Sequence, residues 1–267
     1  MILFFLFLLG LAVGSFLNVL IDRLPAEESP FKGRSHCEDC KKILAWYDLM
    51  PIFSFFFLKG KCRYCRFPIS YYYPLVELTT GALFVAISIF VNNNFQFSIF
   101  NFQSNLNFQW GQILTLIYYL FVVSSLIVVF FTDLKYGIIP DKIVYPSILV
   151  SIAYLFINHK SLFINHLLVG IGAFIFFLLL FLATRGRGMG FGDVKLVFLL
   201  GLFLGWPKIM LALYFAFLTG AVLGCILILW RKKRLSETIP FGPFLSAGAF
   251  IAMFFGDVFL KLVYHVG

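Results

Sequence analysis

The chain has 267 residues, of which 61% are hydrophobic and only 12% are charged, and its mean hydropathy is +0.97. Water-soluble globular proteins carry roughly 25% charged residues, so this composition excludes a soluble globule and predicts a polytopic membrane protein. The net charge of +9 would suggest nucleic-acid binding in a soluble protein, but membrane topology explains it better here. We therefore expect membrane lipid around the chain and no nucleic-acid partner.

Apolar runs long enough to form membrane helices recur along the sequence. A helix that crosses about 30 Å of hydrocarbon needs about 20 residues, and eight runs approach this length, the fourth and sixth being short. They span about residues 2–21, 74–91, 111–132, 143–157, 165–184, 194–206, 209–230 and 243–263. The predicted fold is all-α, with about eight transmembrane helices and one small polar insertion.

These runs divide the chain into three predicted parts. Residues 1–21 form a first transmembrane helix, which we interpret as retained rather than as a removable signal peptide. Residues 22–73 form the sizeable polar segment, and residues 74–267 form a transmembrane core. A Gly10-xxx-Gly14 spacing in the first helix is typical of close helix packing in membranes.

Lysine and arginine are distributed unevenly between the two sides of the membrane. With eight crossings, eighteen of them fall on one side and three on the other. Because cytoplasmic loops carry an excess of Lys and Arg, the richer side, which holds residues 22–73, is predicted to be cytoplasmic. The basic cluster at residues 231–234 is interpreted as a stop signal and headgroup contact rather than a nucleic-acid patch.

Four of the five cysteines form two closely spaced pairs. Cys37 and Cys40 are spaced CxxC, and Cys62 and Cys65 repeat this spacing after twenty-one further residues. Two such knuckles place four thiolates around one Zn²⁺ in a closed site that is structural rather than catalytic. Two disulfides are the competing interpretation, but the predicted compartment is reducing. We expect the zinc ion to stabilise the fold of residues 22–73, because this segment is too small to form an adequate hydrophobic core of its own.

Three acidic residues are notable because an ionisable group at or inside the membrane is costly. Asp133 ends the third run, Asp193 opens the sixth, and Glu77 lies near the start of the second. Asp133 and Asp193 fall on the same predicted side, at helix ends that can pack together. Two adjacent carboxyl groups share a proton, so one takes a proton from water while the other donates to a peptide carbonyl oxygen. This is the chemistry of aspartyl proteolysis.

Simpler roles are also compatible with the same two aspartates. Asp133 could be a solvated helix end with Lys135 as its partner. Asp193 could be an N-cap or first-turn acid that the helix dipole stabilises, with Lys195 nearby. Sequence alone leaves both pairs of alternatives open.

Three other acids have different expected roles. Asp141 follows Ile139 and Pro140 and is expected to cap the fourth helix. Glu77 either pairs with an arginine of residues 22–73 or lines the site. Asp257 lies near the outer end of the last run and is expected to be an interface residue.

Several motifs together resemble a known family, the prepilin peptidases, or type IV leader peptidases, which are GxGD-type intramembrane aspartyl proteases. The resemblance covers nearly the whole chain and follows the family's order. The motifs are GSFLNV at residues 14–19, RLP at 23–25, SHCEDC at 35–40, GKCRYC at 60–65, IPD at 139–141, GFGD at 190–193 and IPFGPF at 239–244. By this resemblance the two catalytic aspartates fall on Asp133 and Asp193.

The resemblance implies a substrate and a location. Substrates would be type IV prepilins or pseudopilins of type II secretion, whose basic leader stays in the cytoplasm while an apolar helix spans the membrane. The enzyme would lie in the bacterial cytoplasmic membrane with its active site facing the cytoplasm. Members with the four-cysteine segment resemble a bifunctional type that also N-methylates the new N-terminus with S-adenosylmethionine. No glycine-rich adenosylmethionine-binding pattern is visible in the sequence, so this second activity rests on resemblance alone.

Two other classes of function fit part of the sequence. An ion-coupled transporter would use Glu77, Asp133 and Asp193 along an ion pathway, although no matched pair of interrupted helices is visible. A noncatalytic assembly factor would use the zinc segment to dock a partner.

Overall fold

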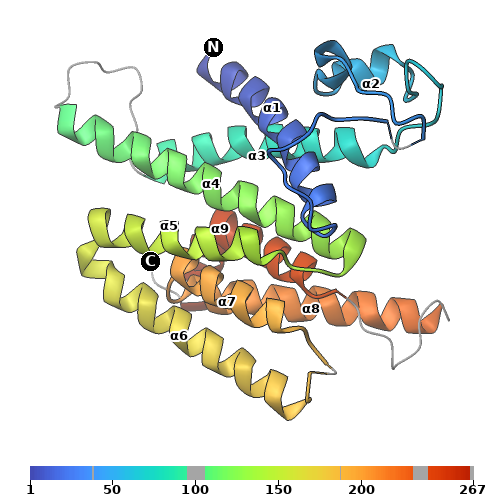
Figure 1. Cartoon of the computed structure of the whole chain (residues 1–267). Helices are drawn as coiled ribbons and strands as arrows, with labels where there is room; N and C mark the ends of the chain where they lie inside the picture. The colour runs from blue at the N-terminus through green and yellow to red at the C-terminus, as the bar shows by residue number, and fades with distance from the viewer. Residues whose placement is uncertain (38, 95–105, 187, 231–239, 265–267) are drawn as a thin grey trace. The chain divides into compact units, whose positions relative to one another are not determined.

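The structure is a computed structural model that describes residues 1–37, 39–94, 106–186, 188–230 and 240–264. Figure 1 shows that it is built from helices, with two isolated β-bridges in the polar segment. In chain order the helices are α1 (Ile2–Arg23), the 3₁₀ helix η1 (Trp46–Leu49), α2 (Phe53–Phe57), α3 (Tyr72–Asn94), α4 (Leu106–Tyr136), α5 (Asp141–Asn158), α6 (Lys160–Ala183), α7 (Phe191–Leu204), α8 (Lys208–Leu229) and α9 (Gly242–Tyr264). The predicted all-α fold is confirmed.

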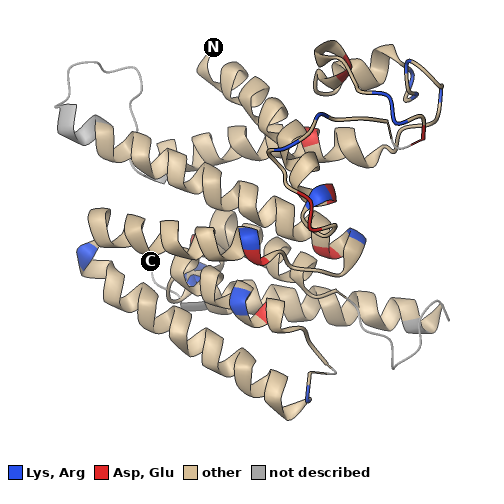
Figure 2. Cartoon of the chain, viewed as in Figure 1, with Lys and Arg blue, Asp and Glu red and all other residues tan. Residues whose placement is uncertain are grey.

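Seven helices in the described part of the chain are long and apolar enough to cross a membrane. They are Ile2–Arg23, Tyr72–Asn92, Trp110–Tyr136, Asp141–Asn158, Lys160–Ala183, Lys208–Leu227 and Gly242–Leu262. Charged residues gather at the helix ends and in the polar segment (Figure 2). The multi-pass architecture is therefore confirmed, and the basic cluster at residues 231–234 lies outside the described residues.

The helix α6 begins five residues earlier than the predicted run at 165–184. The chain turns from α5 into α6 at a single residue, His159, whose ring nitrogen lies 3.2 Å from the Tyr154 hydroxyl. Polar residues around this turn suggested a longer loop, but they lie within the two helices because the turn itself is tight.

The chain forms two compact units, Met1–Val128 and Val129–Gly267, and α4 contributes to both. In the first unit α1 packs along α3. A Cβ on Gly10 would lie 2.7 Å from the Gly81 Cα, and one on Gly14 would lie 2.7 Å from the Glu77 Cα. The predicted packing role of Gly10-xxx-Gly14 is confirmed. The predicted three-part division of the chain stays a prediction.

In the second unit α7 is the central helix and packs against α5, α6, α8 and α9. It has 14 residues and is therefore about 21 Å long, which is short for a membrane crossing. Ten of those residues are buried, so protein rather than lipid surrounds the helix. A helix enclosed in this way need not match the thickness of the bilayer, which explains why the sixth predicted crossing is absent from the seven long helices.

The contact between α6 and α7 depends on two glycines. A Cβ on Gly201 would lie 2.5 Å from the Gly170 Cα, a backbone atom that cannot rotate away. We predict that Gly201→Ala forces the two helices apart and lowers the free energy of unfolding by roughly 1–3 kcal/mol. Thermal unfolding in detergent measures this effect. The control is Gly172→Ala on α6, because a Cβ there meets nothing within 4 Å; equal melting temperatures for the two variants would contradict the account.

Candidate functional site

Asp133 lies in the last turn of α4, in the second unit, and its side chain reaches the start of α9. It is only 5% exposed, and its Oδ2 accepts a hydrogen bond of 2.8 Å from the Gly242 N–H. The carboxylate thus satisfies a free N–H at a helix N-terminus, where the helix dipole favours negative charge. A solvated Asp133 is therefore excluded by its burial.

Gly242 is required for this contact because any side chain there would meet the carboxyl group. A Cβ at this position would lie 2.7 Å from the Asp133 Oδ2 and 3.2 Å from its Cγ. The glycine therefore lets the backbone of α9 approach the acid closely.

Asp193 lies in the first turn of α7 and is also 5% exposed. Its Oδ2 accepts a hydrogen bond of 3.1 Å from the N–H of Gly190, the N-cap residue. The simpler expectation of a first-turn acid is confirmed in this respect. However, the Asp193 Oδ1 is buried and has no hydrogen-bond partner among the described residues. Because buried polar atoms are almost always partnered, capping alone does not account for this side chain.

The two carboxyl groups come together at the ends of α4 and α7. The negative charge of Asp133 acts electrostatically on the carboxyl of Asp193. Neither acid forms an ion pair with a cation in the described part of the chain. Such an arrangement, two buried acids with a free oxygen and no cation, is suited to sharing a proton and binding a water molecule.

The loop between α4 and α5 lies against the start of α7. A Cβ on Gly192 would lie 2.9 Å from the Ile139 side chain, and the Lys195 ammonium forms an ion pair with Asp141. Lys195 thus pairs with Asp141 rather than with Asp193. The expectation that Asp141 caps the helix is wrong, because Asp141 is the first residue of α5, the N-cap residue is Pro140, and no side chain caps this end. These contacts fix the segment after Asp133 to the segment around Asp193.

Two buried hydroxyl groups on α4 and α9 have no hydrogen-bond partner among the described residues. They belong to Thr132, next to Asp133 in α4, and to Ser246, one turn into α9 from Gly242. Sequence analysis missed both, because neither residue type is unusual within an apolar helix. Asp257, predicted at an interface, forms a 2.9 Å ion pair with Lys208.

Glu77 lies in the first unit and contacts the polar segment through the backbone. It is 8% exposed, and its Oε2 accepts a hydrogen bond of 2.7 Å from the Ile52 N–H. Of the two expected roles, pairing with an arginine or lining the site, the first is wrong in its partner, because a backbone amide of the polar segment occupies this position. Ile52 has φ of 62°, which is strained for a β-branched residue, so the carboxylate holds the chain in an unfavourable turn.

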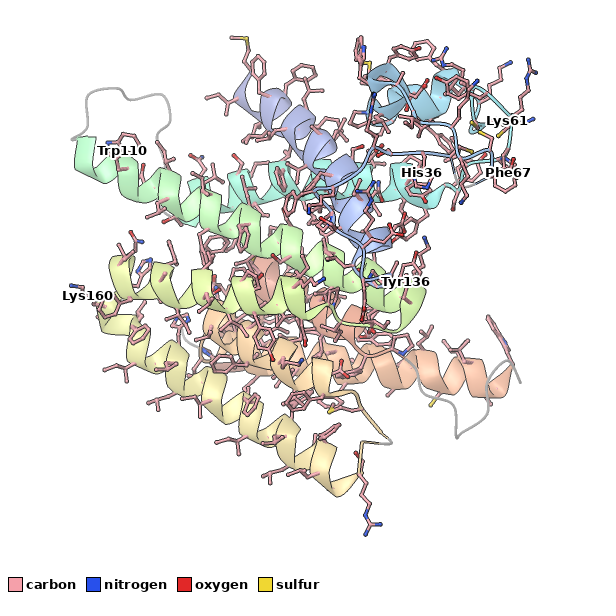
Figure 3. The ribbon with its side chains drawn as sticks, viewed as in Figure 1. His36, Lys61, Phe67, Trp110, Tyr136 and Lys160 are labelled. Atoms are coloured by element: carbon pink, nitrogen blue, oxygen red, sulfur yellow. The ribbon has the colours of Figure 1, made fainter. Side chains whose placement is uncertain are left out.

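The two cysteine knuckles repeat one hydrogen-bond pattern with an offset of 25 residues. In each knuckle the first cysteine N–H and carbonyl are both bonded, and a residue with positive φ follows the second cysteine. The bonds are Cys37 N–H to the Lys42 carbonyl (3.0 Å), Lys41 N–H to Cys37 (3.0 Å), Cys62 N–H to Phe67 (2.8 Å) and Arg66 N–H to Cys62 (3.0 Å). Figure 3 shows Lys61 and Phe67 on the second of these loops.

The sulfur atoms of the four cysteines fit one tetrahedral metal ion. All four lie within 4.8 Å of one another, and the Sγ atoms of Cys37 and Cys65 are 3.7 Å apart. Zinc–sulfur bonds of about 2.3 Å in a tetrahedron place sulfurs about 3.8 Å apart. A disulfide would bring two sulfurs to about 2.05 Å, and the cysteines are free. The donor set is therefore suited to zinc.

Hydrogen bonds, burial and neighbouring thiols shift the pKa values of two of these cysteines. The Cys65 N–H lowers the pKa of the Cys62 thiol to about 7, against the effect of burial. For Cys65 the Phe67 N–H lowers the pKa, but burial and the neighbouring thiols of Cys40, Cys62 and Cys37 raise it to about 12. Neighbouring thiols thus oppose one another's ionisation. A divalent cation would allow all four to be thiolates.

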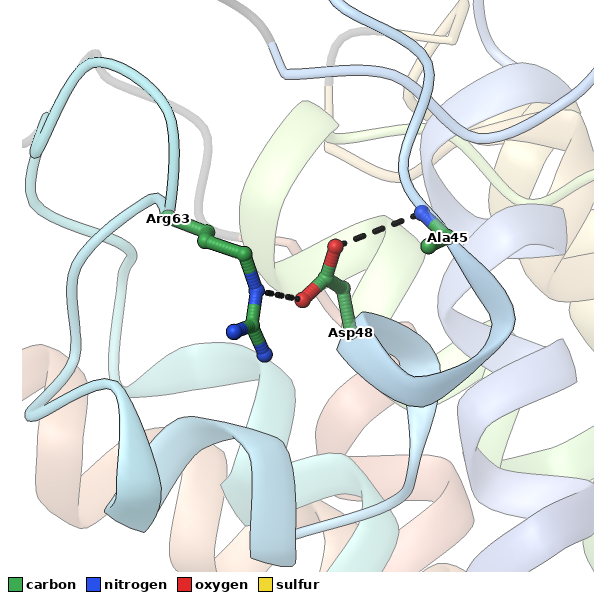
Figure 4. A network of polar contacts seen from close by, with 3 residues as sticks. All are labelled: Ala45, Asp48 and Arg63. Carbon is green, nitrogen blue, oxygen red and sulfur yellow. Dashed lines mark hydrogen bonds and ion pairs between the residues drawn. The ribbon is translucent and has the colours of Figure 1, made fainter.

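Asp48 joins the second knuckle to the helix η1, a contact that sequence analysis missed. Its Oδ1 accepts a 2.6 Å hydrogen bond from the Arg63 Nε, and its Oδ2 accepts one of 3.3 Å from the Ala45 N–H (Figure 4). The Asp48 side chain is 2% exposed. The only sequence feature that could have indicated this contact is the position of an acidic residue between the two cysteine knuckles.

Two family models match the sequence. Residues 8–91 match the Bacterial Peptidase A24 N-terminal domain, and residues 120–225 match the Type IV leader peptidase family. Three similar proteins are each named "Prepilin leader peptidase/N-methyltransferase". Those of Aeromonas hydrophila and Bacillus subtilis strain 168 are both 32% identical; each match covers 94% of this chain, with 90% and 94% of the relative respectively. That of Myxococcus xanthus strain DK1622 is 37% identical over 84% of this chain, which corresponds to 63% of the relative. No solved structure gives a significant match.

The cysteine geometry predicts about one zinc per chain. The variant Cys37→Ser with Cys62→Ser removes one ligand from each knuckle, so we expect it to lose the metal, as measured by elemental analysis of purified protein. Because protons compete with zinc for the thiolates, acidification should also release the metal. Cys225→Ser is the matched control, since this cysteine is exposed and outside the cluster. Zinc retained at wild-type level in the double variant would contradict this assignment.

Proposed function

The chain belongs to the type IV leader peptidase family. We propose that it is a membrane-embedded aspartyl endopeptidase that removes the basic leader from prepilins or pseudopilins. We propose Asp133 and Asp193 as its catalytic residues. The observation that carries this assignment is that both carboxyl groups are buried, that neither has a cationic partner in the described chain, and that the Asp193 Oδ1 has no hydrogen-bond partner there. Membership of this family favours a peptidase over an ion-coupled transporter.

The pair would act through one shared proton. The ionised carboxyl takes a proton from a water molecule, whose oxygen attacks the carbonyl carbon of the scissile peptide bond. The protonated carboxyl donates its proton to the carbonyl oxygen. When the tetrahedral intermediate collapses, the C–N bond breaks, and the leaving nitrogen receives a proton as the pair returns to its starting state. The two protonation roles belong to the pair, since strongly coupled groups titrate together.

The site would face the cytoplasm. The asymmetry of eighteen basic residues against three supports this orientation, because the α4 and α7 ends that carry the two aspartates fall on the basic side. The leader of a prepilin is basic, and the positive-inside bias would retain it in the cytoplasm. Cleavage at the membrane boundary then matches acids at helix ends.

The second proposed activity is N-methylation of the new N-terminus, which rests on the names of the relatives. S-adenosylmethionine would supply the methyl group. A cavity of about 320 Å³ near the second knuckle is lined by Tyr47, Met50, Phe53, Ser54, Phe57 and Arg63. A sulfonium and a ribose favour acidic partners, and this lining has one cation and no carboxylate, so it does not fit that cofactor. Glu77 and the surroundings of the zinc segment are the candidates for further search.

The cleavage assignment predicts that Asp133→Asn and Asp193→Asn each lower the rate by about a thousandfold or more, because each removes a proton-transferring group. The assay follows conversion of full-length prepilin by purified protein in detergent. Asp257→Asn is the matched control, since it also removes a helix acid but one paired with Lys208. Normal cleavage by either Asn variant at the catalytic positions would falsify the assignment.

The methylation proposal is tested on the product of the same reaction. With S-adenosylmethionine present, the mass of the mature pilin should rise by one methyl group. The Asn variants should yield no methylated mature pilin because they produce no new N-terminus. A fully cleaved product without added mass would restrict this chain to peptidase activity.

The ion pair between Lys195 and Asp141 predicts a positioning role. Lys195→Met should lower kcat by roughly tenfold through displacement of Asp193, with little change in KM or melting temperature. Lys195→Arg keeps the charge and should restore most of the rate. If the Met variant loses stability and KM together with kcat, or if Arg rescues nothing, the pair has no such role.

A further inference from the structure

The segment 46–57, which we call the aromatic segment, exposes more apolar surface than its place in the chain explains. It contains η1 and α2 and lies between the two cysteine knuckles, outside every candidate membrane span. Phe57 is 84% exposed, Trp46 74% and Phe56 72%. Leu49, Met50 and Phe53 are also exposed. A contiguous apolar surface of this kind marks a membrane or partner contact.

The contact with Glu77 fixes the position of the aromatic segment along the axis of α3. Ile52, the N-cap residue of α2, donates its N–H to the Glu77 carboxylate at 2.7 Å. Glu77 lies five residues after Tyr72, where the span begins, which is about 7.5 Å along the helix axis. The start of α2 therefore lies level with the first turns of a membrane-spanning helix, the depth at which a bilayer has its headgroups.

The inward and outward sides of α2 differ in the way an interfacial helix requires. The Phe55 ring packs on the Tyr71 ring, with centroids 5.2 Å apart, and contacts the Gly60 position. Phe56 and Phe57 point away from the protein, as their exposure shows. The segment therefore has one side attached to the protein and one apolar side that is largely exposed.

Charge identifies the surface that the apolar side meets. Residues 41–71 contain six cations and one acid, and the acid, Asp48, is buried against Arg63. Lys59, Lys61 and Arg63 follow directly after the exposed phenylalanines. Basic residues beside exposed aromatic residues are typical of segments that lie on anionic lipid.

The cavity of about 320 Å³ fits the same lipid. Its lining is mainly apolar, with polar groups on Tyr47, Ser54 and Arg63. The Arg63 Nε is bonded to Asp48, and Figure 4 shows no bond from its two terminal nitrogens to the residues drawn. The side chain is 45% exposed. The guanidinium can therefore bind a phosphate while Met50, Phe53 and Phe57 contact the apolar part of the lipid.

We propose that the aromatic segment is an interfacial anchor that lies in the headgroup region of the bilayer and binds anionic phospholipid. The anchor holds the four-cysteine cluster at the membrane surface beside α3. This proposal does not depend on peptidase or methyltransferase activity, so it is tested without substrate.

The test measures the contact of Trp46 with lipid and with water. Full-length protein in nanodiscs carries Trp110→Phe, Trp206→Phe and Trp230→Phe, which leaves Trp46 as the only tryptophan; the replaced residues are all exposed. Phosphatidylglycerol brominated near the headgroup should lower the Trp46 fluorescence roughly twofold, as for an interfacial residue. Iodide in the water should quench it weakly.

Two variants separate the parts of the proposal. Phe56→Asp with Phe57→Asp should abolish the bromolipid quenching and expose Trp46 to iodide, with zinc content unchanged as evidence of folding. Phe31→Asp is the matched control because Phe31 is equally exposed, at 84%, but lies outside the segment. Lys59→Gln with Lys61→Gln should remove the preference for brominated phosphatidylglycerol over brominated phosphatidylcholine.

Three results would overturn the proposal. If iodide quenches the Trp46 fluorescence and brominated lipid does not, the aromatic segment lies in water. Trp46 that neither reagent quenches, in nanodiscs holding one protein copy, would mean that another part of the chain covers it. Equal quenching by the two brominated lipids in the parent protein would exclude an anionic preference.

Discussion

Two carboxyl groups buried without a cation are the constraint around which the second unit is organised. Each of Asp133 and Asp193 has one oxygen held by a backbone N–H at a helix N-terminus. Helix ends stabilise negative charge without a basic side chain. Gly242 and Gly190 are therefore parts of the site even though they carry no reactive group. The same need for enclosure explains why α7 is short and surrounded by four helices.

In the first unit, a small polar segment folds beside apolar helices. The two knuckles repeat the same hydrogen bonds and bring four thiols together, and Asp48 ties the second knuckle to η1 through Arg63. Glu77 then fastens this segment to α3 through the Ile52 amide. A buried acid within a span thus serves here as an attachment point, a role unlike that of the two aspartates.

Composition and local spacing predicted the features that depend on neighbouring residues in the chain. The apolar runs predicted the long helices, and the two CxxC spacings predicted the cysteine cluster. Contacts between residues far apart in the sequence could not be predicted. Examples are the hydrogen bond between Asp133 and the Gly242 amide, 109 residues later, and the ion pair between Lys195 and Asp141. Helix α7 overlaps the sixth predicted crossing, but its enclosure by four helices and its length of only 14 residues could not be predicted, because an apolar run has the same composition whether lipid or protein surrounds it. The orientation in the membrane, which rests on charge counting, stays a prediction.

The central claim is that Asp133 and Asp193 jointly hold one water molecule. A density map of the protein in a lipid nanodisc, detailed enough to show ordered water, tests this directly. The account predicts one water within hydrogen-bonding distance, about 2.7–3.0 Å, of a carboxyl oxygen of each aspartate, with the Asp193 Oδ1 among its partners. Separate basic or amide partners on each carboxyl, with protein atoms filling the space between them, would contradict it.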